Sequence, residues 1–102
     1  MIVVQGTARV HPDDVTALRE SVAIMVAATR AESGCEAYGF AEDMLEPGLM
    51  HIAERWRDDA ALQAHFATPH MAAFNAALGK ARILGVKVVA YTVSGERVLA
   101  GG

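Results

Sequence analysis

The sequence is poor in several features that mark particular classes of protein. It has one cysteine, three prolines and 6% aromatic residues in 102 positions. The longest wholly apolar run, residues 22–28, has seven residues, whereas a membrane-spanning helix needs about 20. Because Cys35 has no second cysteine to pair with, an internal disulfide is excluded, and we expect a reducing, cytoplasmic location.

The charge also excludes partners. Nine basic residues against twelve acidic ones give a net charge of -3, so the basic footprint of a nucleic-acid or anionic-membrane protein is missing. The first residues carry no positively charged segment of a secretory signal. A hydrophobic content of 53% is ample for a core, and the length predicts one domain over residues 1–102.

Hydrophobic periodicity predicts the first half of the fold. Residues 2–10 alternate as a strand, and apolar residues at spacings of three and four follow Pro12, predicting a helix that ends at about Ala31. Gly34 is placed for a left-handed cap after that helix. Residues 35–42 and 49–56 then read as a hairpin around the turn signal Glu46-Pro47-Gly48.

The second half adds two short helices and a strand. Asp58 is a predicted N-cap for a helix ending at His65 or Phe66, and Thr68 caps a second helix with Pro69 in its first turn. Its apolar stripe extends to Ala81, Gly85 ends the helix, and residues 86–93 form the last strand. The order β-α-β-β-α-β predicts an α+β, ferredoxin-like fold with one antiparallel sheet.

The predicted sheet is apolar on both faces. Neighbouring residues such as Val3-Val4 and Val88-Val89 point to opposite faces, yet both are hydrophobic. Helices cover one face only, and no third layer is left in the chain. We therefore predict a homodimer in which a second copy covers the other face.

Two histidines mark the candidate site. His65 shares a helix face with Ala61 and Leu62, and His70 precedes Phe74 by four residues, so both rings should face the space between helices and sheet. An imidazole there is suited to be a general base, because its pKa lies near neutrality. The alternative is a pair of structural histidines bound to backbone carbonyls. A metal is not expected, since the spacing differs from His-x-x-x-His and no Cys or acid clusters beside the pair.

Neighbouring side chains admit two roles each. Trp56 is either core or a cavity wall that stacks on an aromatic ligand. Tyr38 shares a strand face with Phe40, which favours packing, although its hydroxyl could open into the cavity. Glu54 alternates with Ile52 and Trp56, and we expect it to be half-buried and paired with Arg9 or Arg55.

These residues also resemble a known family. Gly34-Cys35-x-x-Tyr38, followed by Glu54-x-Trp56-x-Asp58-x-x-Ala61-Leu62-x-x-His65-x-x-Thr68-Pro69-His70-x-x-x-Phe74, is similar to the antibiotic biosynthesis monooxygenase (ABM) domain. The resemblance implies a dimeric α+β barrel and an oxygenase that needs no cofactor and oxidises a small quinol- or anthrone-like aromatic with O2. It implies catalytic roles for His65 and His70 and substrate contacts from Tyr38, Trp56, Phe66, Phe74 and Asn75.

The family is mixed, so other activities stay open. Haem-degrading members carry an asparagine, a tryptophan and a histidine where this chain has Gln5, His65 and Asn75, which disfavours haem degradation. Isomerisation of a small carbonyl or sugar phosphate is a rival, for which Arg9, Arg82 or Lys87 could bind the phosphate. A dimer that binds a small ligand without catalysis is the second rival.

Overall fold

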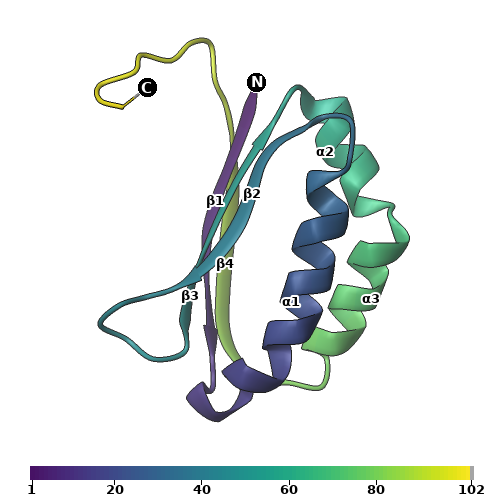
Figure 1. Cartoon of the computed structure of the whole chain (residues 1–102), viewed down its shortest axis with the longest axis vertical. Coiled ribbons are helices and arrows are strands. Elements are labelled where there is room, and N and C mark those ends of the chain that lie inside the picture. Colours follow the sequence, from purple (N-terminus) through teal and green to yellow (C-terminus); the bar gives the residue numbers. More distant parts are fainter. Residues whose placement is uncertain (102) are drawn as a thin grey trace.

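The computed structural model describes residues 1–101 and shows one sheet with its helices on one side (Figure 1). The chain alternates strands and helices in the predicted order, apart from a short 3-10 turn at Pro12–Asp14. The elements are β1 (Ile2–Val10), α1 (Val15–Arg30), β2 (Cys35–Glu42), β3 (Leu49–Trp56), α2 (Asp59–Phe66), α3 (Pro69–Leu78) and β4 (Ile83–Thr92).

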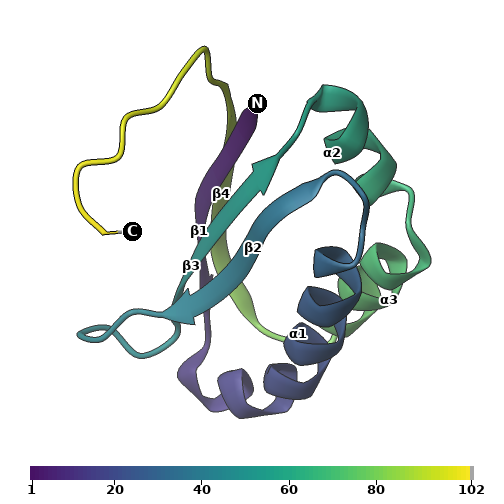
Figure 2. The same cartoon turned by 45° about the horizontal axis from the view of Figure 1, so that its top comes forward.

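The sheet is antiparallel, with strand order β2-β3-β1-β4. One row across it consists of Tyr38, Glu54, Val4 and Ala90, which are direct neighbours in register. Because successive strand residues point to opposite faces, this row belongs to one face, and the helices cover that face (Figures 1 and 2). The predicted α+β, ferredoxin-like fold is confirmed.

Local signals set the starts of the short helices as predicted. The Asp58 carboxylate accepts a hydrogen bond from the backbone N–H of Ala61 at 2.8 Å, which caps α2. The Thr68 hydroxyl accepts one from the N–H of Met71, and Pro69 occupies the first turn of α3. These caps begin both helices at defined residues and so orient the side chains of α2 and α3.

The boundary between α3 and β4 differs from the prediction. The last helix ends at Leu78, and β4 already begins at Ile83, so Gly85 lies inside the strand. The alanine-rich sequence favours a longer helix, but pairing with β1 takes these residues into the sheet, where Gly85 is opposite Arg9.

The prediction for Gly34 was wrong in its reason. Its backbone is not left-handed; within residues 1–101 a positive φ occurs only at Gly48 (86°) and Gly101 (95°). Gly34 is required for another reason: a Cβ at this position would overlap the Cβ of Ala61 on α2. The missing side chain therefore lets α2 dock closely on the turn that follows α1.

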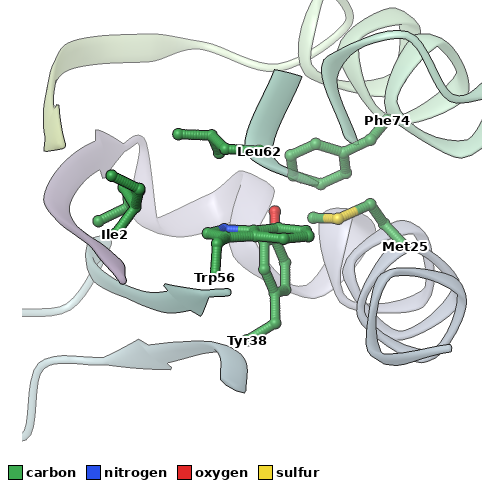
Figure 3. Close-up of a cluster of buried hydrophobic side chains, with 7 residues drawn as sticks. Ile2, Met25, Tyr38, Trp56, Leu62 and Phe74 are labelled. Atoms are coloured by element: carbon green, nitrogen blue, oxygen red, sulfur yellow. The ribbon is translucent and has the colours of Figure 1, made fainter. Parts of the chain in front are cut away.

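The core is built around Trp56. Figure 3 shows its indole between Ile2 and Met25, with Leu62 and Phe74 on the helix side and Tyr38 beside it. The indole is fully buried. In the described part of the chain, no helix has the length and apolarity needed to cross a membrane.

The other sheet face has no helix over it. The chain after Thr92 runs along this side without regular structure (Figure 2), and its Glu96 forms a salt bridge with Arg55 of β3. Tyr91 on this face is half exposed, and Val98 and Leu99 in the tail are mostly exposed. The face is thus open and partly apolar.

Candidate active site

A cavity of about 600 Å³ lies between the sheet and the three helices. This volume lies within the range of small-molecule sites, and most of its lining is apolar. It is open to solvent, and its lining includes the exposed residues Phe66, Val86 and Val88, at 57%, 63% and 46%. Its polar lining residues are few: Arg19, Tyr38, Glu42, Glu54, His65 and Asn75.

A carboxylate fixes both candidate histidines. One oxygen of Glu32, Oε2, lies 2.7 Å from Nδ1 of His65 and 2.8 Å from Nε2 of His70. An ionised carboxylate only accepts hydrogen bonds, so we assign a proton to each of these two ring nitrogens. His65 is 1% exposed and lines the cavity, whereas Glu32, which holds its Nδ1, is not part of the lining.

The second nitrogen of His65 is available to a ligand. With Nδ1 protonated, Nε2 of the neutral ring is an acceptor, and it makes no hydrogen bond within the described residues. No buried side-chain nitrogen or oxygen there lacks a partner, so Nε2 is not sealed in the core. His65 lines the cavity, so its ring carries one nitrogen without a partner in the protein at the cavity wall, and such a nitrogen has the chemistry of a proton acceptor.

Trp56 supports two polar groups of the cavity. Its ring lies 4.8 Å, centroid to centroid, from that of His65, and its Nε1–H donates to Oε1 of Glu54 at 2.9 Å. The expected arginine partner of Glu54 was therefore wrong. Arg9 pairs instead with Glu46, and Arg55 with Glu36 and Glu96.

Burial changes the acidity of two cavity groups. The pKa of Glu54 is raised by desolvation, although the hydrogen bond from Trp56 works against this. The pKa of Tyr38 is raised above its usual range, chiefly by burial and then by the charge of Glu54. Tyr38 therefore keeps its proton, and its ring packs 5.3 Å from His65.

The structure brings most of the predicted site residues together. His65, Tyr38, Phe66, Phe74 and Asn75 line the cavity. Two others lie outside the lining: Trp56 packs behind it in the core, and His70 lies on the far side of Glu32, contrary to the expectation that both imidazoles face the cavity.

Sequence reasoning missed Glu32. It precedes His65 by 33 residues and His70 by 38, so no short motif connects them. The available signal was topological: Glu32 lies between α1 and the start of β2, and Cys35 at that start pairs with Trp56 at the end of β3, from which the chain enters α2.

The expectation that no acidic residue lies beside the two histidines was wrong: with Glu32 included, the cluster has the donors of a metal site. Its three ligand atoms lie within 4.8 Å of one another, and one carboxylate with two imidazoles is a donor set that Zn²⁺ takes. A metal would have to replace the two N–H···O hydrogen bonds seen here.

The three cations considered for phosphate binding lie elsewhere. Arg9 is bound to Glu46, and Arg82 to Asp14 at 3.0 Å. Lys87 pairs with Thr7 in register, so its side chain is on the open face rather than on that of Val86 and Val88. Arg19 is the one arginine or lysine that lines the cavity within residues 1–101.

Comparison with known proteins identifies the class. The family model "Antibiotic biosynthesis monooxygenase" (ABM) matches residues 1–77, and the chain belongs to this family. It is 37% identical over 83 residues to "Putative monooxygenase Rv0793" of Mycobacterium tuberculosis, covering 81% of this chain and 78% of that protein. It is also 37% identical over 73 residues to protein sll1783 of Synechocystis, where it spans only 50% of the relative's length.

Solved structures agree. A "putative antibiotic biosynthesis monooxygenase" from Deinococcus radiodurans superposes with a TM-score of 0.88 at 30% identity and full coverage of both chains. The Rv0793 structure gives a TM-score of 0.83 at 30% identity, covering 95% of this chain and 98% of that one.

Proposed function

We propose that the protein is a monooxygenase that needs no cofactor and oxidises a small quinol- or anthrone-like aromatic with O2. The observation that carries the proposal is His65: Glu32 holds its Nδ1–H, the residue lines an apolar cavity, and its Nε2 makes no hydrogen bond within the described residues. This arrangement supports a general base, because Glu32 fixes the tautomer and stabilises the imidazolium that forms.

The reaction can be written in balanced steps. Nε2 takes a proton from the substrate's activated C–H or O–H, and the carbanion or phenolate gives one electron to O2. Superoxide and the substrate radical then combine into a C–O bond, and the peroxide anion takes a proton. Loss of water breaks the O–O bond. For an anthrone methylene the sum is R2CH2 + O2 → R2CO + H2O. An apolar, water-poor cavity favours this course, because it limits competing protonation of the reactive anion.

Oxygen uptake tests the proposal. We expect chelator-treated protein to consume O2 above the autoxidation blank with at least one member of a hydroquinone and anthrone panel. Because the chelator removes loosely held metal, this uptake would belong to the side chains. No uptake across the panel would contradict the oxygenase assignment. Retention of phosphate esters in a binding screen would then favour the isomerase, and tight binding without turnover a non-catalytic binding protein.

We also propose that two copies pack through the open sheet face. Val3, Val89 and Tyr91 lie on that face. The tail after Thr92, which contains the exposed Val98 and Leu99, runs on the same side of the sheet (Figure 2). Burial of this apolar surface would stabilise a dimer. Light scattering coupled to gel filtration should give twice the 10.8 kDa mass of the chain. A monomer at micromolar concentration would contradict it.

A further inference from the structure

Glu54 has one carboxylate oxygen that the protein does not use. Oε1 accepts the hydrogen bond of Trp56, whereas Oε2 makes none in the described part of the chain. The structure contains no buried side-chain oxygen without a partner there, so Oε2 is not enclosed in the core. Since Glu54 lines the cavity, this oxygen is available to a ligand.

Glu54 and His65 belong to the same end of the cavity. Trp56 contacts both: its ring packs on His65 and its N–H holds Glu54. Glu54 lies two residues before the end of β3, and the chain then continues into α2, which carries His65 (Figure 1). A ligand hydroxyl at this end would therefore meet two fixed acceptors, a ring nitrogen and a carboxylate oxygen.

The charge at this end is negative. Glu54 lines the cavity, and the Glu32 carboxylate lies directly behind His65. The lining arginine, Arg19, is in the second turn of α1, at the opposite end of the helix layer from α2 (Figure 1). Like charges in a partly desolvated site repel strongly, so an anionic group of a ligand should bind poorly at this end, whereas a neutral hydroxyl can bind there.

We propose that Glu54 is the specificity-determining residue of this cavity: its free oxygen accepts the O–H of a phenolic ligand, and its negative charge excludes carboxylates and phosphate esters of the same shape. The inference deepens the proposed function, on which it rests for the location of the site. It makes Glu54 a binding residue and assigns it no step in proton abstraction or oxygen transfer.

Calorimetric titration under nitrogen at neutral pH tests whether anionic ligands are excluded. The three ligands share a naphthalene ring and differ in the group at position 2: 2-naphthol, 2-naphthoate and 2-naphthyl phosphate. We expect the wild-type protein to bind 2-naphthol at least about tenfold more tightly than either anion. One hydrogen bond to a charged group contributes a difference in affinity of this size. Equal affinities, or no binding of 2-naphthol, would overturn the proposal without any variant.

Glu54→Gln tests the residue itself. The amide oxygen of the variant can still accept the hydrogen bond of Trp56, but the substitution removes the negative charge. We therefore expect 2-naphthol to bind more weakly and 2-naphthoate to bind more tightly. The preference should fall by about tenfold or more. Glu20→Gln is the matched control, because it removes one negative charge from an exposed residue outside the cavity lining; it should keep the preference.

The result separates this proposal from the oxygenase. An equal loss of affinity for all three ligands in Glu54→Gln would mean that Glu54 only supports Trp56, and the proposal would be wrong. Because binding is measured without O2, failure of oxygen uptake leaves the selectivity result valid. A lost preference together with normal oxygen uptake would leave His65 as the base.

Discussion

Oxygen consumption should fall by roughly 100- to 10,000-fold when His65 is replaced by asparagine, the range expected for loss of a general base. The amide of His65→Asn can still donate a hydrogen bond to Glu32, so the partly buried carboxylate keeps a donor at this position. The basic nitrogen that faces the cavity is lost. The measurement is the initial rate of O2 uptake with the best substrate of the panel, with circular dichroism to confirm the fold.

A second histidine provides the control for this variant. His51 is half exposed and pairs with Asp43 at 2.8 Å, away from the cavity lining. His51→Asn should therefore retain the wild-type rate within about twofold, a change of less than about 1 kcal/mol in activation free energy. Wild-type turnover in His65→Asn would show that His65 is structural and that another group removes the proton.

The largest loss of stability is expected from Trp56→Ala. Truncation of a buried tryptophan typically lowers the unfolding free energy by about 3–5 kcal/mol, because the hydrophobic burial of the removed ring is lost and a cavity is left in the core. Here it would also remove the donor to Glu54 and the ring that packs on His65. Urea unfolding followed by circular dichroism measures the change in unfolding free energy.

An aromatic residue outside the core gives the comparison. Phe66 is 57% exposed at the mouth of the cavity, so Phe66→Ala should change the unfolding free energy by less than about 1 kcal/mol. A loss of this small size for Trp56→Ala would mean that the core around Ile2, Met25 and Leu62 repacks into the space, and that Trp56 is not its centre.

Local patterns were enough to predict most of the fold. Alternation predicts the first strand, the turn signal at Pro47 and Gly48 places the hairpin, and polar caps mark the starts of both short helices. The end of α3 was predicted too late because the signal there is weak. The sequence near Ala81 is compatible with a helix, and only pairing of β4 with the central strand β1 decides the matter.

The candidate site was predicted less completely, for a related reason. The closeness of His65 and His70 follows from their helices, but Glu32 reaches them through the tertiary fold. The partner of Glu54 could have been predicted from the sequence. Trp56 lies two residues away on the same strand face, so the alternation of a strand already places the two side chains together. Opposite charge drew attention to Arg9 and Arg55, whereas the indole N–H is the donor that shares the burial of Glu54.

The contact between Gly34 and Ala61 has a consequence for how relatives of this protein should be compared. Neither residue lines the cavity, yet together they set how closely α2, and so His65, approaches the sheet. A side chain larger than hydrogen at position 34 would push that helix outward and move the ring with it. The two positions therefore act as a single spacer, and a relative with a bulkier residue at one of them should hold its histidine differently, even where every residue of the cavity is identical.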